Sequence, residues 1–490
     1  MLICTKLHME AFIFRFFPAV ALFFALMPTP LAAQADPPLL LRNIRILDLS
    51  GSDPVLKPDQ SVLIDGGTIT AVGPTTAVTI PSAARVVDGG GRIAMPGLVD
   101  MHVHVWDEAA LGAYLARGVT TIRNASGMPF HLRLAQEITA GRIAGPRLIT
   151  TGPILNSYGP NAQVNHQIVA NGTEARAAVR AQHEAGYRHI KVYSNLSREA
   201  YEAARDEARA LGMTVMGHTP EGVREPGMPR TRPFNIAFEE LLDDGFITVE
   251  HIESIVWHGL RDAHDEAAAK NLAARVAAAG VPVDPTLLAF YNLMRVAETR
   301  GEYLDRPDVD ILNPLVVAQE QENYDRWSGE AIAPARAAFD FYKRATKIFA
   351  DAGVLIVTGS DAGIFTNIPG RSLIQELHLL SEAGLSHGEV LRAATQNAAM
   401  ALGEADEAGR IAPGHRADLI LLDDNPLDDL DAAGRPAMVI AGGRLYDRTA
   451  LDQLHGAASQ PDLARTRKNL IEGLRAQGVD PSILGGQPAS

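Results

Sequence analysis

The sequence predicts an α/β protein whose middle part is a TIM-like (β/α)8 barrel and whose two ends combine in a small β-sandwich domain. Three observations carry this prediction. From about residue 97 to 403, apolar segments of strand length alternate with alanine-rich segments of helical character, the pattern of parallel strands joined by crossover helices. Eight strand candidates can be counted there, which is the number that closes a barrel. Segments with Val/Ile alternation and Gly-containing turns stand before and after this part.

The eight candidate strands occur in the order in which a barrel would use them. They are GLVDMHVH (97–104), VTTIRNAS (119–126), RLITTGP (147–153), HIKVYSN (189–195), TVMGHTP (214–220), ITVEHIES (247–254), VPVDPTLLAF (281–290) and LIVTGSDAG (355–363). Helix candidates between them, such as residues 173–186, 197–212 and 334–353, end at Gly, the residue expected at a helix C-terminus. The main alternative is a doubly wound open sheet, but no Gly-rich phosphate loop follows the first strand.

Both chain ends have the pattern of antiparallel hairpins with Gly-Gly or Asp-Gly turns. The hairpin segments are residues 39–49, 60–74, 85–97, 417–424 and 437–447. We therefore expect a signal peptide over 1–35, a small β-domain over 36–95 and 406–447, a metallohydrolase barrel over 96–405, and a C-terminal helix and tail over 448–490. The segments 220–246 and 294–333 are too long for ordinary barrel loops, and we expect them to cover the barrel mouth.

The N-terminus has the three zones of a cleavable signal peptide. Lys6 and Arg15 precede the apolar stretch FFPAVALFFALM, and AQA at 33–35 supplies a small-x-small cleavage site. A periplasmic or secreted protein without stable membrane insertion is expected; an uncleaved anchor or a buried first helix is the alternative. The only cysteine, Cys4, lies inside this segment. A metal in the mature chain must therefore use His, Asp, Glu or a modified Lys.

The net charge of −14 and the lack of a basic stripe argue against a nucleic-acid partner. We expect the partner to be a small-molecule substrate. Whether the chain forms a homo-oligomer is left open by the sequence.

Polar residues that can bind a metal follow the ends of five candidate strands. His102 and His104 are two positions apart in an extended segment, so their side chains lie on one face; alone, such a pair can equally be ordinary polar residues. The further residues are Lys191, His218, His251 and Asp361. Barrel active sites lie at the C-terminal strand ends, and four imidazoles with a carboxylate are ligands that zinc accepts. A carboxylated Lys191 would be anionic and could bridge two ions, which indicates metal-assisted hydrolysis.

These residues, with the segments MPGLVDMHVH (95–104), ATQNAAMALG (394–403) and GRIAPGHRADLILLD (409–423), resemble the amidohydrolase superfamily, in particular its imidazolonepropionase-like and Xaa-Pro dipeptidase-like members. The resemblance covers roughly residues 39 to 447. It implies that His102, His104 and Asp361 hold one divalent ion and that His218 and His251 hold the other. It further implies that carboxylated Lys191 bridges two zinc ions. Where the family often has Asp in a TTVRD segment, this chain has Asn124.

The resemblance implies a binuclear amidohydrolase that cleaves amide-type C–N bonds in dipeptides, N-acyl amino acids or cyclic amides. A metal-activated hydroxide attacks, and Asp361 shuttles the proton to the leaving amine. Tyr158, His166 and Tyr193 are candidates for substrate contact, although each can equally be an ordinary loop or barrel residue. An ester, lactone or phosphotriester hydrolase on the same centre is one alternative. A catalytically silent metal- or solute-binding protein is the other, but such a protein needs no proton shuttle.

Overall fold

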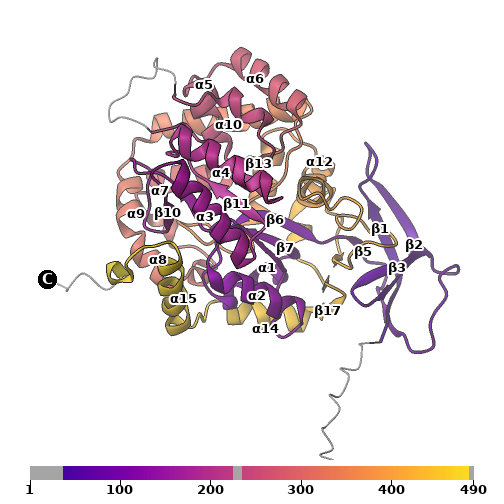
Figure 1. Cartoon of the computed structure of the whole chain (residues 1–490). Coiled ribbons are helices and arrows are strands. Elements are labelled where there is room, and N and C mark those ends of the chain that lie inside the picture. The colour runs from indigo at the N-terminus through magenta and orange to yellow at the C-terminus, as the bar shows by residue number, and fades with distance from the viewer. Residues whose placement is uncertain (1–36, 224–233, 485–490) are drawn as a thin grey trace, which may run out of the picture. The chain divides into compact units, whose positions relative to one another are not determined.

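Parallel strands and helices alternate through the middle of the chain (Figure 1). The computed structural model describes residues 37–223 and 234–484, so the expected signal peptide lies outside the described residues. The parallel strands are β6 (Leu98–Val103), β7 (Val119–Asn124), β8 (Arg147–Thr150), β9 (Ile154–Asn156), β10 (His166–Ile168), β11 (His189–Val192), β12 (Thr214–Gly217), β13 (Phe246–Glu250) and β14 (Val283–Asp284). They confirm the predicted α/β class.

Among the described residues, the strand ladders form two parallel sheets and not one closed barrel. One sheet has the order β6-β7-β8, the other β10-β9-β11-β12-β13-β14. The eighth expected strand forms only isolated bridges, to β14 through Val283 and Ile356 and to the end of β6 through Val103 and Ala362. Within this segment Gly359 packs so closely that a Cβ there would lie 2.1 Å from Oδ2 of Asp284. The segment still lies between the two sheets. It bridges to β14 on one side, and on the other side the carbonyl of Thr358 accepts from the amide of Met101 in β6 at 2.8 Å.

Helix α3 begins and ends at capping residues. Asn171 accepts a hydrogen bond from the amide of Glu174 at the start of α3, and Gly186, with φ 110°, ends that helix. The helices are α1 (Leu111–Ala116), α2 (Pro129–Thr139), α3 (Gly172–Ala185), α4 (Arg198–Ala210), α5 (Ile252–Leu260), α6 (Glu266–Ala279), α7 (Leu287–Thr299), α8 (Pro314–Gln319), α9 (Gln321–Ser328), α10 (Ile332–Asp351), α11 (Arg371–Glu382), α12 (His387–Arg392), α13 (Ala398–Ala401), α14 (Arg448–Ala458) and α15 (Leu463–Ala476). Strands β6 and β7 are buried at every position, as expected for parallel strands covered on both faces.

Strands from both chain ends join in one mostly antiparallel sheet, visible beside the parallel strands in Figure 1. The strands are β1 (Leu39–Asp48), β2 (Val55–Asp65), β3 (Thr68–Pro74), β4 (Arg85–Asp88), β5 (Ile93–Pro96), β15 (Leu419–Leu422), β16 (Met438–Ala441) and β17 (Arg444–Asp447). β5 lies between β1 and β15 and so connects the two ends. The predicted association of the ends is thus confirmed; their division into two sandwich layers and the exact domain boundaries stay predictions.

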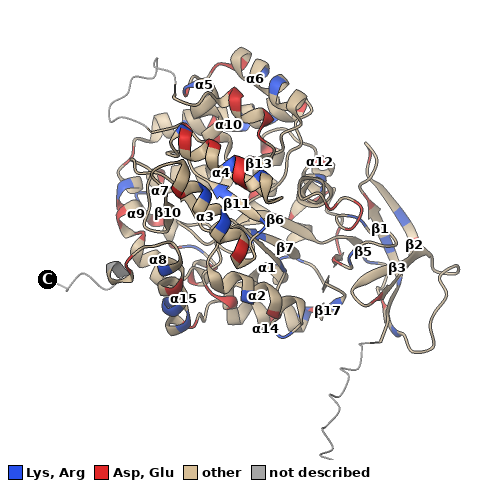
Figure 2. Cartoon of the chain, viewed as in Figure 1, with Lys and Arg blue, Asp and Glu red and all other residues tan. Residues whose placement is uncertain are grey.

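Basic and acidic residues are interspersed over the described helices (Figure 2). Within the described ranges, none of the helices has the length and apolar character needed to cross a bilayer.

Candidate active site

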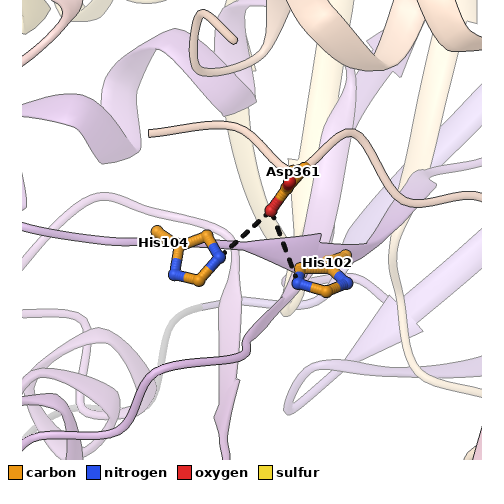
Figure 3. Close-up of side chains that lie close together, drawn as sticks. All are labelled: His102, His104 and Asp361. Atoms are coloured by element: carbon orange, nitrogen blue, oxygen red, sulfur yellow. Dashed lines mark hydrogen bonds and ion pairs between the residues drawn. The ribbon is translucent and has the colours of Figure 1, made fainter. Parts of the chain in front are cut away.

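Strand β6 and the irregular segment after residue 354 bring three predicted ligands together (Figure 3). Oδ1 of Asp361 lies 3.1 Å from Nε2 of His104 and 3.4 Å from Nε2 of His102. The backbone fixes this approach, because the amide of Asp361 donates to the carbonyl of His102 at 2.8 Å. Asp361 has a φ of 54°, a conformation that costs free energy in a non-glycine residue and is concentrated at functional sites. All three side chains are buried.

Lys191, on β11, extends into the same cluster. Its Nζ lies 2.9 Å from Nε2 of His102, and only 1% of the residue is exposed. Burial lowers the pKa of Lys191 to about 8, because a desolvated ammonium is disfavoured relative to the amine. An uncharged amine is the form that can react with carbon dioxide to give a carbamate.

His218, directly after β12, and His251, directly after β13, complete the cluster. Their ring centres are 4.4 Å apart, and that of His251 is 4.8 Å from that of His102. Nδ1 of His251 lies 2.6 Å from the hydroxyl of Thr286. Burial lowers the pKa of His251 to about 4 and holds the pKa of His218 well below its usual value. Both rings are therefore neutral at pH 7, the form in which imidazole nitrogens donate lone pairs to a metal.

Asp361 is ionised in this environment. Burial alone would raise its pKa, but the neighbouring His102 and the hydrogen bond with His104 outweigh that effect and hold the pKa below the usual range. The carboxylate is thus an anion surrounded by imidazoles, which suits both metal binding and proton transfer.

A buried polar group lies behind His102, and the sequence interpretation missed it. Nδ1 of His102 is 2.7 Å from Oε2 of Glu250, and the guanidinium of Arg123 donates to Oε1 at 2.8 Å. Asp284 lies close enough that its carboxylate, with His102 and Glu250, forms a second group of possible metal ligands. Neither oxygen of Asp284 has a hydrogen-bond partner among the described residues. The sequence signal for this group was a charged residue inside an otherwise apolar strand segment: Glu250 in FITVEH and Arg123 in TTIRN.

The three candidates for substrate contact differ in their surroundings. The Tyr193 ring packs between His218 and His166, with ring-centre distances of 3.9 and 4.5 Å. His166 is buried, and its Nδ1 lies 3.2 Å from the amide nitrogen of Asn156. Tyr158 is 73% exposed. The structure therefore brings Tyr193 and His166 to the cluster, whereas Tyr158 lies at the surface.

Asn124, the departure from the family pattern, holds the segment that follows β6. Its side-chain oxygen accepts from the amide of Val105 at 3.0 Å, and its nitrogen donates to Thr150 at 3.0 Å. Neither hydrogen bond needs a charged side chain, so Asn can take the place of the family's Asp at this position.

The long segment after α7 reaches the loop that carries Asp361. The carboxylate of Glu320 accepts from the amide of Phe365 at 2.6 Å, and Tyr324 donates to the carbonyl of the same residue. Asn292 donates to Asn367, whose side chain donates to the carbonyl of Asp361 at 3.1 Å. The segment from 294 to 333 thus contacts the loop that carries Asp361, while its covering of the barrel mouth stays a prediction.

Comparisons with known proteins agree with this fold. The family model described as "Amidohydrolase family" matches residues 247–446. The chain is 25% identical over 419 residues to a 5-methylthioadenosine/S-adenosylhomocysteine deaminase of Carboxydothermus hydrogenoformans, covering 79% of this chain and 84% of that protein. It is 25% identical over 391 residues to an imidazolonepropionase of Rubrobacter xylanophilus, covering 74% and 84%. A Xaa-Pro dipeptidase crystal structure matches with a TM-score of 0.63 at 20% identity, over 84% of this chain and all of that one.

These matches confirm the resemblance found in the sequence. The chain resembles the amidohydrolase family over residues 247–446, and the enzyme class that this likeness supports is a hydrolase acting on carbon–nitrogen bonds.

Proposed function

We propose that the protein is an exported, binuclear metal-dependent amidohydrolase that cleaves amide bonds in dipeptides, N-acyl amino acids or cyclic amides. The observation that carries the proposal is the convergence of four histidines, three of them buried, with Asp361 and Lys191. Their positions are linked by the contacts His102–Asp361, His102–Lys191, His102–His251 and His251–His218.

The donor set fits divalent metal ions. Nδ1 of His218 is buried and has no hydrogen-bond partner among the described residues, although buried polar atoms normally have one. His102, His104 and Asp361 would hold one ion, His218 and His251 the other, and carboxylated Lys191 would lie between them. Zinc suits such nitrogen and oxygen ligands. When bound, the ions would supply a nucleophilic water at neutral pH and polarise the scissile carbonyl.

Asp361 has the proton-transfer role. Its ionised carboxylate can accept the proton of the attacking water and pass it to the leaving nitrogen. Because departure of an unprotonated amide anion is very unfavourable, the second transfer matters most for amide substrates. Tyr193 and His166 adjoin His218 and are the proposed contacts to substrate; Tyr158 would contribute only at the pocket entrance.

The proposed substrate range follows from the family resemblance. Relatives named as a deaminase and an imidazolonepropionase support chemistry at a carbon–nitrogen bond and do not select one substrate. We further propose that the two parallel sheets and the segment from 354 to 361 act together as the family's barrel.

Asp361→Asn tests the function, with kcat/KM and bound metal measured on a matched amide and ester pair. General acid–base catalysis contributes about 10²–10⁴-fold, so amide hydrolysis should fall at least about a hundredfold while the ester suffers less. Near-normal amide turnover by a metal-replete variant would exclude the proton-transfer role. A wild-type protein that binds metal but turns over neither substrate class would favour a silent binding protein, and turnover of esters alone would favour the esterase alternative.

Export is tested separately by mass spectrometry of the periplasmic and secreted fractions. We expect a mature N-terminus near Asp36, because the basic, apolar and small-residue zones are in signal-peptide order. An intact N-terminus in those fractions would contradict the proposal.

A further inference from the structure

The C-terminal helix α15 is attached to the segment that leaves the candidate metal site. Residues 104–108 continue the chain beyond His104, and Asp107 within them is only 2% exposed. Arg465, on α15, donates to both carboxylate oxygens of Asp107, from Nε at 2.9 Å and from a terminal nitrogen at 2.8 Å. Such a two-pronged pair of a guanidinium with a carboxylate fixes orientation as well as distance.

The same segment is held at three other points by the parallel-strand region itself. Asn124 and His131 bind the backbone of Val105, at 3.0 and 2.7 Å. The indole of Trp106 donates to the carbonyl of Gly363 at 2.8 Å. Because Gly363 is two residues after Asp361, the Trp106 bond joins the segment that carries His104 to the loop that carries Asp361.

Helix α15 supplies the fourth attachment, and it lies outside the part of the chain matched by the family model, residues 247–446. Thr466, next to Arg465, also donates to Asp107 at 3.4 Å and accepts from Asn313 of the long covering segment at 3.1 Å. A cavity is lined by His104 and Trp106 together with Ala458 and Pro461 of the C-terminal segment. The C-terminal segment therefore reaches the surroundings of a proposed ligand.

We propose that Arg465 is a positioning residue for the metal site: by holding Asp107, it fixes the segment from His104 to Trp106 and thereby the approach of His104 to Asp361. The proposal rests on the proposed metal-dependent function. Helix α15 would then determine metal affinity in addition to the stability of the fold. Loss of an outer contact that orients a metal ligand typically weakens metal binding about 10–100-fold.

The chain contains a matched control on the same helix. Arg133 of α2 donates to both oxygens of Glu472 of α15, at 2.8 and 2.7 Å. This pair also ties α15 to the parallel-strand region, but it is more exposed, and its two hydrogen bonds join only Arg133 and Glu472. Loss of either arginine side chain should therefore loosen the packing of α15. Only loss of Arg465 should change the position of His104.

The experiment compares Arg465→Gln, Arg465→Lys and Arg133→Gln in the full chain. Zinc affinity is measured by competition with a chromogenic chelator, alongside kcat, KM and the thermal midpoint. We expect Arg465→Gln to weaken zinc binding at least about tenfold, and Arg465→Lys to recover part of the loss because it keeps the charge without the fork geometry. Arg133→Gln should change zinc affinity less than about twofold, since exposed pairs contribute little.

Equal zinc affinities for folded Arg465→Gln and wild type would overturn the proposal, as would an equal loss in Arg133→Gln. If Arg465→Gln does not fold, Arg465→Lys decides: unchanged zinc affinity overturns the proposal and a loss supports it. The wild-type protein separates this inference from the proposed function. Absence of zinc binding or amide turnover in wild type would refute the function itself, whereas a normal wild type with insensitive Arg465 variants would refute only the inference.

Discussion

Substitution of Glu250 by Gln should weaken metal binding although Glu250 is not among the proposed ligands. Its Oε2 lies 2.7 Å from Nδ1 of His102, and its Oε1 accepts from Arg123 at 2.8 Å. The carboxylate therefore keeps the proton of His102 on Nδ1 and leaves Nε2, the atom nearest Asp361, with a free lone pair.

A Gln side chain of the same shape cannot serve both partners. If its oxygen faces His102, its amide nitrogen meets the donor nitrogen of Arg123. If it is turned round, its nitrogen faces Nδ1, which must then accept, and the imidazole proton moves to Nε2 where a metal would bind. Removing one member of a buried ion pair costs about 3–5 kcal/mol of stability. Disturbing a ligand's outer hydrogen bond lowers metal affinity about 10–100-fold.

Zinc competition titrations and urea unfolding of Glu250→Gln measure both effects. Glu404→Gln is the control, because Glu404 also pairs with an arginine, Arg147, at 2.6 Å, and both hydrogen bonds of its carboxylate go to that arginine and not to a proposed ligand. We expect both variants to lose stability and only Glu250→Gln to lose zinc affinity. Wild-type zinc affinity in a folded Glu250→Gln protein would refute the assigned role of Glu250.

Two further predictions concern pH and packing. Burial lowers the pKa of His131 to about 4, below the value of about 6.5 in an unfolded chain, so between these pH values the unfolded state binds the extra proton. Stability should therefore rise from pH 4 to 6.5 by up to about 1.4 kcal/mol per pH unit from this group; an unchanged slope in His131→Gln unfolding curves would contradict this. Gly359→Ala should destabilise the fold by about 1–3 kcal/mol, because the added Cβ would lie 2.1 Å from Oδ2 of Asp284 and 2.7 Å from Cβ of His102. A wild-type melting temperature in that variant would show that the site can relax around the methyl group.

The proposed ligands could be predicted from the sequence because their signal is local. A two-residue spacing sets His102 and His104 on one strand face, and parallel strands bring their C-terminal ends together. Lys191, His218 and His251 follow the same rule and lie in one cluster. The association of the two chain ends was likewise visible as hairpin patterns, since β5 and β15 pair directly.

The remaining features depend on contacts between distant segments. Glu250 and Arg123 are isolated charges in apolar strands, and only the folded arrangement pairs them. The left-handed backbone of His251 and Asp361 has no residue signature, because both are non-glycine residues. The eighth strand was expected to be regular, but the segment forms only isolated bridges, to Val283 and to Val103. The exposure of Tyr158 depends on loop geometry that a sequence pattern does not encode.

Metal content measured together with amide turnover tests whether the protein is a binuclear metal-dependent amidohydrolase. Mature protein purified from zinc- and bicarbonate-supplemented medium is analysed for divalent ions per chain and assayed on dipeptide and N-acyl amino acid pools before and after chelation. We expect about two ions per chain, with turnover that is lost on chelation and restored by zinc. One ion or none in metal-replete protein, or amide turnover that survives complete removal of metal, would contradict it.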